Sequence, residues 1–431
     1  MRAGAGKIRR ASIATMGLAV ALLAGCGQGE QEGVTTIRYG RWGTPDEIKA
    51  EKELIRIFEQ ENPGIRVEIE FASWGEYWNK LQAQMAASSA PDVILMGGTH
   101  LRDFAARGQL MDLREMAGEE DGIDLGEYYP ASVEVFEFND SLWAVPRDCN
   151  TIAMYYNKNL FDKYGVEYPK PDWTWEDFHA KAKALSRDDD SDGRMDSYGY
   201  LATFESMEVH WVSWVWQNGA NVLNSTRTKC EINSPEAFEA LDFFSGMVLR
   251  DKISPDTAQA STFGSNMFLT GRLAMSSEGS WMVKTFKEIE AFKWDAVPLP
   301  RNKEAVYPVN GLGNSIYAKT KNREAAWKLA KFLGSRRYQE NLARTGTSVP
   351  AMISVANSPL YLSGEMEGKK YFLESIEKGR VQDFTMGFAR WESAIRSQLE
   401  LVWLGRKPLK EALDQAAVDV DAILAMNAGQ P

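Results

Sequence analysis

Segments with the periodicity of strands and of helices alternate along the chain. Residues 65–71 (IRVEIEF) alternate apolar and polar side chains, which is the two-residue period of a half-buried strand. Residues 44–62 instead repeat apolar side chains three and four positions apart, which predicts a helix with one buried face. This helix has a defined start, because Thr44 can cap it and Glu47 completes a capping box.

The alternation continues through the rest of the chain. Further strands are predicted at 36–40, 92–96, 142–146 and 152–157, and further helices at 74–88, from 173 onward and at 409–425. Alternating strands and helices imply parallel sheets covered by helices. In such sheets ligands bind outside the carboxyl ends of the strands, so the turns at 41–44 and 96–99 are candidate binding turns.

The composition is that of a large acidic globular protein. The chain has 431 residues, 44% of them hydrophobic, which is enough for two domains with cores of their own. The formal net charge is −11; the first 25 residues carry four basic side chains and no acidic one, so the remainder carries −15. An acidic surface argues against nucleic-acid binding, in which phosphate contacts supply much of the affinity.

Histidine and cysteine are scarce. His100, His179 and His210 show no zinc-ligand spacing, so a histidine-based metal site is not expected. Cys149 and Cys230 lie far apart in the sequence. A disulfide between them and two buried free thiols are both open interpretations.

The amino terminus has the features of an export signal. Residues 2–10 are basic, and residues 11–24 form an apolar run of about fourteen residues, which suits a signal peptide better than a membrane span. The run ends in Leu-Ala-Gly-Cys, which resembles the bacterial lipobox. We therefore predict a signal peptide at 1–25, lipidation at Cys26 and a flexible tether at 26–33, which places the domains outside the cytoplasm on a membrane anchor. An ordinary secretory signal is the alternative.

Several segments resemble, in order and spacing, those of the solute-binding proteins of bacterial ABC sugar importers, a family that includes the maltodextrin-binding proteins. They are 90–94 (APDVI) with 104–110 (FAARGQL), 143–146 (WAVP) with 154–161 (MYYNKNLF), 173–178 (WTWEDF), 271–275 (GRLAM) with 278–281 (EGSW), and 405–413 (GRKPLKEAL). Each segment is short, but together they extend over residues 35–425.

The resemblance implies a two-lobed α/β fold, in which each lobe has a mainly parallel sheet with helices on both faces. Three chain crossings would form the hinge, giving an N-lobe of 34–149 with 314–347 and a C-lobe of 150–313 with 348–431. A monomeric protein of this kind captures its ligand in the cleft, closes around it and delivers it to a membrane permease. It is not an enzyme and requires no cofactor.

A sugar site needs aromatic faces together with amides, carboxylates or arginines at its rim. The strand-end rule nominates Trp42 and the turn of Gly98 and Thr99, and Trp74 opens a helix directly after a strand. The resemblance adds further candidates: Trp281, Asp148, Asn150, Asn310, Gly311 and Trp391. For each of these residues, packing in the core or bonding within the hinge is the alternative role.

One acidic loop has the spacing of the first part of a calcium-binding loop. Asp188, Asp190, Asp192 and Asp196 occupy positions one, three, five and nine, with glycine at position six. Position twelve is Gly199, so the bidentate glutamate is missing. A structural calcium site and an exposed acidic turn are both open interpretations.

Two other functions compete with sugar import. The same fold can bind a polyamine, a peptide or a metal ion, each of which needs a different set of cleft residues. An extracellular glycosidase would need two carboxyl groups roughly 5 to 9 Å apart, for which Glu278 is a candidate, but no segment resembles a hydrolase motif.

Overall fold

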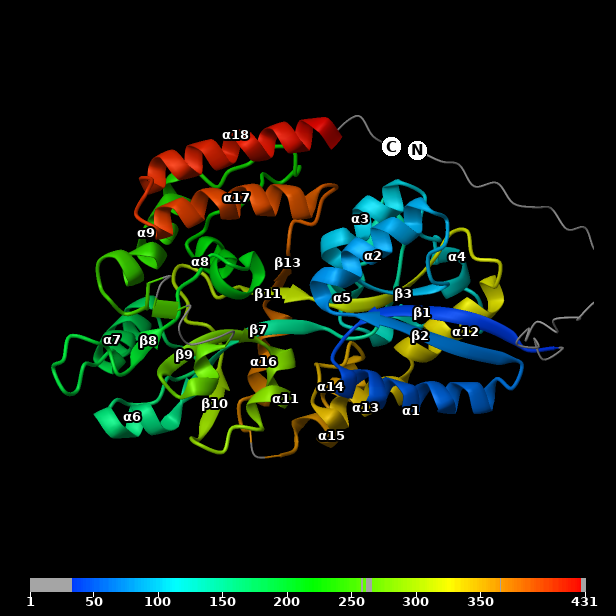
Figure 1. The fold of residues 1–431 in the computed structure, drawn as a ribbon, viewed down its shortest axis with the longest axis horizontal. Helices are drawn as coiled ribbons and strands as arrows, with labels where there is room; N and C mark the ends of the chain where they lie inside the picture. Colours follow the sequence, from blue (N-terminus) through cyan, green and yellow to red (C-terminus); the bar gives the residue numbers. More distant parts are fainter. Residues whose placement is uncertain (1–32, 257–258, 261–265, 365, 428–431) are drawn as a thin grey trace, which may run out of the picture. The chain divides into compact units, whose positions relative to one another are not determined.

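The computed structural model describes residues 33–256, 259–260, 266–364 and 366–427 (Figure 1). The predicted signal peptide, Cys26 and most of the predicted tether lie outside the described residues. Within the described part of the chain, no helix is long and apolar enough to cross a membrane. The strands of this part form two large sheets and one short hairpin.

The first sheet has five strands and forms the centre of what we call the N-lobe. Its order is β2 (Ile65–Ala72), β1 (Thr35–Trp42), β3 (Val93–Gly97), β12 (Leu312–Ile316) and β6 (Val145–Pro146). Helices that contact these strands are α1 (Pro45–Glu61), α2 (Trp74–Ala86), α3 (Gly98–Ala106) and α12 (Arg323–Gly334). β1 runs parallel to β2 and β3, as the alternating pattern predicts.

The second sheet has six strands and forms the centre of the C-lobe. Its path is β13 (Gly379–Val381), β11 (Tyr307–Asn310), β7 (Asn150–Asn157), β9 (Leu273–Gly279) and β8 (Tyr198–Tyr200), and β10 (Trp294–Val297) also pairs with β7. Helices that contact these strands include α6 (Lys158–Tyr164), α7 (Trp175–Leu185), α8 (Val212–Gln217) and α16 (Lys369–Glu377). Every residue of β7 is buried, so this strand forms the middle of the lobe.

The sheets are mixed, which differs from the mainly parallel sheets that the resemblance implies. β7 runs antiparallel to β9, β10 and β11, and β12 runs antiparallel to β3 and β6. The crossings account for part of this. The chain enters the C-lobe sheet along β7 and leaves it along β11, and it leaves the N-lobe sheet along β6 and returns along β12, so each of these pairs is antiparallel.

The remaining elements cover the two lobes. They are α4 (Arg114–Ala117), α5 (Pro130–Glu134), β4 (Glu137–Phe138), β5 (Ser141–Leu142), α9 (Pro235–Leu249), α11 (Val283–Phe286), α13 (Arg336–Thr345), α14 (Ile353–Ala356), α15 (Pro359–Leu362), α17 (Phe388–Trp403) and α18 (Leu409–Asn427). α17 and α18 pack along each other. The single strand predicted at 142–146 is instead β5 and β6, because the chain turns between them at Trp143 and Ala144.

Local chemistry fixes the start of the first helix as predicted. The Thr44 hydroxyl accepts the backbone N–H of Glu47, and the Glu47 carboxylate accepts the backbone N–H of Thr44. Thr174 and Asp177 form the same reciprocal pair at the start of α7. These bonds satisfy backbone donors that have no partner within the helix.

Three segments lie side by side where the chain passes between the sheets. The N–H of Cys149 donates to the carbonyl of Val349 at 2.9 Å, and Asn310 pairs with Asn150 across β11 and β7. This is the three-crossing hinge that the resemblance implies, although the residues predicted as lobe boundaries stay a prediction. Cys149 and Cys230 are both buried and form no disulfide.

Candidate ligand-binding site

A pocket of about 450 Å³ lies between the two sheets, beside the hinge. The N-lobe contributes the end of β1 and the start of α2, as the strand-end rule predicts. The C-lobe contributes two short segments, η2 (Met207–Trp211), which is a π-helical turn, and η4 (Ser280–Met282), which is a 3-10 turn. The crossing segments, including Asn310 and Gly311, form the base.

Large aromatic side chains reach the pocket from both lobes. Trp74 is 52% exposed and Trp281 is 37% exposed, which is unusual for tryptophan in a protein with this much buried apolar surface. Trp42 supports Trp74 edge-on, with ring centroids 4.8 Å apart and ring planes at 88°. The pocket is therefore lined by an accessible indole on each lobe, and one of the two is held by a second ring.

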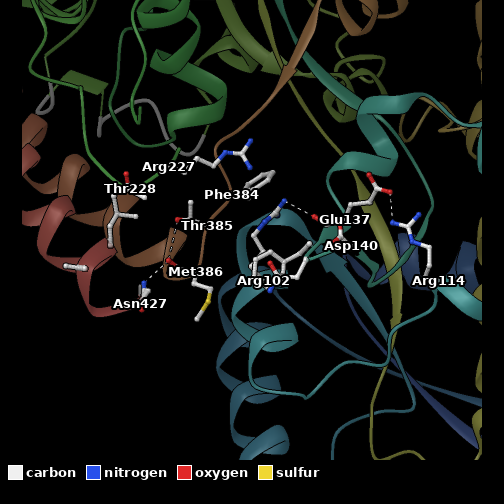
Figure 2. Close-up of a pocket in the computed structure, with 14 residues that line it drawn as sticks. Arg102, Arg114, Glu137, Asp140, Arg227, Thr228, Phe384, Thr385, Met386 and Asn427 are labelled. Carbon is white, nitrogen blue, oxygen red and sulfur yellow. Dashed lines mark hydrogen bonds and ion pairs between the residues drawn. The ribbon is translucent and has the colours of Figure 1, made fainter. Parts of the chain in front are cut away.

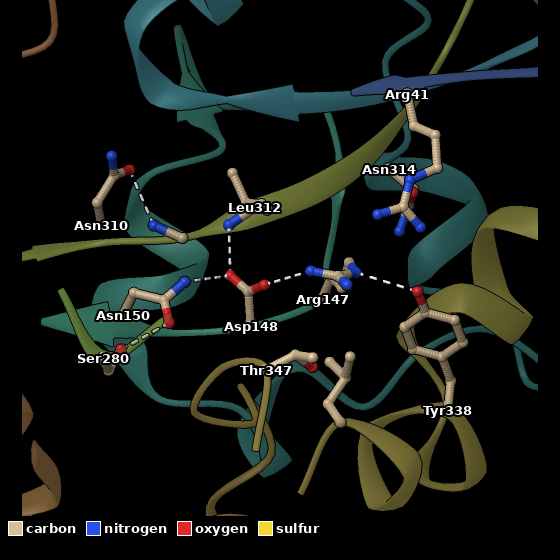
Figure 3. Close-up of polar contacts among 12 residues, drawn as sticks. Arg41, Arg147, Asp148, Asn150, Ser280, Asn310, Leu312, Asn314, Tyr338 and Thr347 are labelled. Atoms are coloured by element: carbon tan, nitrogen blue, oxygen red, sulfur yellow. Dashed lines mark hydrogen bonds and ion pairs between the residues drawn. The ribbon is translucent and has the colours of Figure 1, made fainter. Parts of the chain in front are cut away.

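A chain of polar contacts runs along the base of the pocket (Figure 3). Asp148 is fully buried, and its Oδ1 accepts the Asn150 side-chain amide and the backbone N–H of Leu312, both at 2.8 Å. Asn150 in turn accepts the hydroxyl of Ser280 at 2.8 Å. Asp148 therefore joins two crossings, and Asn150 continues the contacts to the residue beside Trp281.

Two guanidinium groups in the wall are neutralised by carboxylates. Arg147 donates to Asp148 Oδ2 at 2.5 Å, and Arg41 forms a short ion pair with Glu51. The hydroxyl of Tyr338 links the pairs, because it accepts from Arg147 at 3.1 Å and donates to Glu51 at 2.8 Å. Burial raises the pKa of Asp148, and the neighbouring Arg147 opposes that rise. Both pairs are therefore parts of the scaffold, and neither offers an unpaired charge.

Glu208 lines the pocket and is not predicted by the sequence. Its Oε2 accepts the side-chain amide of Asn310 at 3.1 Å, whereas its Oε1 is buried without a partner among the described residues. Burial raises the pKa of Glu208 to about 7, against the lowering effect of Asn310 and Gln382. No local pattern marks Glu208, because its amide partner lies 102 residues away in the sequence.

The structure brings most of the predicted site residues together, and places three elsewhere. The pocket is lined by Trp42, Trp74, Asp148, Asn150, Trp281, Asn310 and Gly311. Gly98 packs against the ring of Phe384, and neither Gly98 nor Thr99 lines the pocket. Trp391 is fully buried in α17, where its N–H donates to the Thr385 hydroxyl at 2.8 Å, so packing is its role in this structure.

A second groove of about 600 Å³ also lies between residues of the two lobes, and Figure 2 shows Arg102 and Phe384 at its centre. Arg102 is buried and donates to the backbone carbonyl of Glu137 at 3.1 Å. Its guanidinium carbon lies 5.6 Å from the centre of the Phe384 ring. Arg102 thus connects α3 to the C-lobe, and the groove has no tryptophan in its lining.

The acidic loop partly fits the geometry of a calcium site. Asp188, Asp190 and Asp196 can bring one oxygen each within 4.8 Å of one another, which suits ligands at about 2.3 to 2.6 Å from one ion. Asp192 is not in this group, and its Oδ1 accepts the backbone N–H of Arg194 at 2.8 Å. Three carboxylates are fewer than the six to eight oxygens that calcium takes, so water or backbone oxygens would have to complete the shell.

Comparison with known proteins decides the family. The family model described as bacterial extracellular solute-binding protein matches residues 43–340. The chain belongs to this family. Among curated relatives of this solute-binding protein, the galactooligosaccharide-binding protein of Bacillus subtilis is 24% identical over 95% of the chain and 96% of its own length. The multiple sugar-binding protein of Streptococcus mutans is 23% identical over 84% of each.

Solved structures of other solute-binding proteins share the fold. An ABC substrate-binding protein from Listeria monocytogenes in complex with cycloalternan superposes with a TM-score of 0.83, at 26% identity, over 91% of this chain and 99% of its own. The sugar-binding protein MalE of Xanthomonas citri gives 0.77, at 24% identity, over 91% and 98%. The resemblance and the two-lobed fold predicted from the sequence are therefore confirmed. The family consists of transport binding proteins and not of enzymes.

Proposed function

We propose that this solute-binding protein captures a sugar in the pocket beside the hinge and delivers it to an ABC permease. The observation that carries the proposal is the pair of accessible indoles, Trp74 on the N-lobe and Trp281 on the C-lobe, that line one pocket. A sugar ring has C–H faces that pack on indole and a rim of hydroxyls that needs polar partners. The pocket supplies the polar partners from the crossing segments.

The arrangement of carboxyl groups favours binding over hydrolysis. Asp148 is fully buried, and both of its oxygens are engaged in hydrogen bonds to the hinge. Glu278, the candidate for a hydrolytic carboxyl group, does not line the pocket. Among the described residues that line the pocket, Glu208 is then the only one whose carboxyl group has no fixed structural role. A glycosidase uses two carboxyl groups, so Glu208 alone does not make a hydrolytic site.

The names of the relatives support a sugar over other solutes.

The amino terminus supports a location outside the cytoplasm. The proposal includes a monomeric protein anchored to the membrane by lipid on Cys26, with the permease as its membrane partner. If the anchor is correct, Cys26→Ala moves the protein from the membrane fraction to the soluble fraction of cells. An unchanged membrane fraction would contradict lipidation at this cysteine.

A thermal-shift screen of the fragment that starts after Cys26 tests the proposal. Mono- and oligosaccharides are compared with polyamines, peptides and divalent metals, because a ligand that binds only the folded state raises Tm. We expect one class of sugar to raise Tm, and Trp281→Ala to reduce that rise. Tyr168→Ala is the matched control, since Tyr168 is 38% exposed and lies outside the pocket.

The other outcomes of the screen separate the competing functions. A rise in Tm with polyamines, peptides or metals alone would contradict a sugar as the ligand, while the protein would still be a solute-binding protein. A separate assay of the same oligosaccharides for newly released reducing ends tests for a glycosidase, and such release would support that function.

A further inference from the structure

Two carboxylates that line the sugar pocket, Glu47 and Glu208, have no cationic partner among the described residues. Arg41 pairs with Glu51, and Arg147 pairs with Asp148. The remaining lining carboxylate, Glu47, accepts the backbone N–H of Thr44 at the start of α1. Among the residues that the structure describes, Glu208 makes no ion pair.

Burial makes the lack of a cation at Glu208 costly. A carboxylate removed from water loses hydration that hydrogen bonds or an opposite charge must replace. The side-chain amides of Asn310 and Gln382 hydrogen-bond to the Glu208 carboxyl group, and neither carries a positive charge. The same burial keeps the pKa of Glu208 near 7, so its charge is present only in part at neutral pH. A bound cation would supply the counter-ion that the Glu208 carboxylate lacks.

We propose that the sugar bound in this pocket carries a basic nitrogen, so that its ammonium group pairs with the carboxylate of Glu208. The inference rests on the proposed sugar-binding function and names the substrate class of the same site. A neutral hydroxyl would donate one hydrogen bond to the carboxylate, but it would leave the carboxylate charge without a counter-ion. An ammonium group does both, and the tryptophans contact the ring of an amino sugar in the same way as that of a neutral one.

The proposed ion pair at Glu208 also connects to the hinge, through Asn310. Asn310, which donates to Glu208, also accepts the backbone N–H of Gly311 at 2.8 Å within a crossing segment. A charge fixed on Glu208 therefore strengthens the orientation of an amide that belongs to the hinge. Binding of the ammonium group is in this way linked directly to the segment about which the lobes move.

Calorimetric titration with matched sugars tests the proposal. Three forms of one monosaccharide and of one disaccharide are compared at neutral pH: the neutral sugar, its 2-amino derivative and the N-acetylated derivative. The neutral sugar matches the amino form in size, and the N-acetylated form keeps the nitrogen without its charge. We expect the amino form to bind about ten- to a hundred-fold more tightly than the other two, the range expected for a hydrogen bond to a charged group. The preference should weaken as salt is added.

Glu208→Gln keeps the shape of the side chain and removes the charge. We expect this variant to lose the preference, so that its affinities for the amino, neutral and N-acetylated forms lie within about three-fold of one another. Glu278→Gln is the matched control, because Glu278 also has a buried carboxyl group with a pKa raised to about 7 but does not line the pocket. That variant should keep the preference.

The outcomes separate the two proposals. If neutral and amino sugars bind equally to the wild-type protein, the inference is wrong and the sugar-binding function stands. If no sugar binds in this titration or in the thermal-shift screen, the proposed function itself fails. Equal loss of both forms in a folded Glu208→Gln protein, checked by its Tm, would also overturn the ammonium pair. The comparison of the amino sugar with the size-matched neutral sugar on the wild-type protein decides the question even if the variant does not fold.

Discussion

Single buried carboxyl groups shape how this molecule responds to pH. Glu278 lies on β9, and its Oε1 accepts the Asn266 amide at 3.3 Å and the Ser276 hydroxyl at 3.2 Å. These two hydrogen bonds lower the pKa of Glu278, but burial has the larger effect and raises it to about 7. The carboxyl group therefore keeps its proton in the folded state at a pH where the unfolded chain has released it.

This raised pKa predicts a loss of stability as pH increases. Between about pH 4.5 and 7 the folded state binds more protons than the unfolded state, so the free energy of unfolding falls as pH rises through that window. Glu278→Gln removes the ionisable group and keeps an acceptor for Asn266 and Ser276. We expect it to stabilise the protein by about 1 to 3 kcal/mol at pH 8 and by much less at pH 5.

Urea unfolding at the two pH values measures the effect. Glu167→Gln, at an exposed position, should change the free energy of unfolding by a few tenths of a kcal/mol at both. A Glu278→Gln protein that is no more stable than the wild type at pH 8 would contradict the raised pKa.

At the scale of the element, the acidic loop between α7 and β8 is the clearest test of a sequence motif. Two carboxylates of the loop already accept hydrogen bonds from its backbone: Asp188 accepts the N–H of Gly193 at 3.0 Å, and Asp196 accepts the N–H of Asp189 at 2.8 Å. The motif predicts an ion, whereas these bonds are also those of an acidic turn. Binding of calcium at this loop stays a prediction.

Calcium should raise Tm if the three clustered carboxylates bind it. Millimolar Ca²⁺ should then raise Tm in proportion to the logarithm of its concentration above Kd, and Asp190→Asn should abolish the rise. Asp172→Asn, at an exposed position outside the cluster, is the control. A wild-type Tm that does not depend on Ca²⁺ would show that the loop is only a turn.

At the scale of the whole molecule, the sequence predicts most of the fold and part of the site. The cap at Thr44 depends on a residue three positions away. The strand-end rule nominates Trp42, which lines the pocket, and the turn of Gly98 and Thr99, which does not. The direction of β7 is not visible in its own sequence, because it depends on pairing with residues 119 to 143 positions away. Glu208 is likewise not predicted, because its hydrogen-bond partner Asn310 lies 102 residues away in the sequence.

Trp391 illustrates the opposite error at this scale. Its position in the carboxyl-terminal segment matches that of a ligand-contacting aromatic residue in the family, but the inner face of α17 directs it into the core. A resemblance places a residue on an element, and the rotation of that element then decides whether the side chain meets the ligand or the core.

The central claim is that one sugar contacts both lobes through Trp74 and Trp281. The measurement that tests it most directly is calorimetric titration of the best sugar from the screen into the wild-type protein, Trp74→Ala, Trp281→Ala and the double variant. Loss of a stacked ring should reduce affinity about ten-fold or more in each single variant, and further in the double variant. An affinity that is unchanged in either single variant, with the protein still folded, would contradict capture of the sugar between the two indoles.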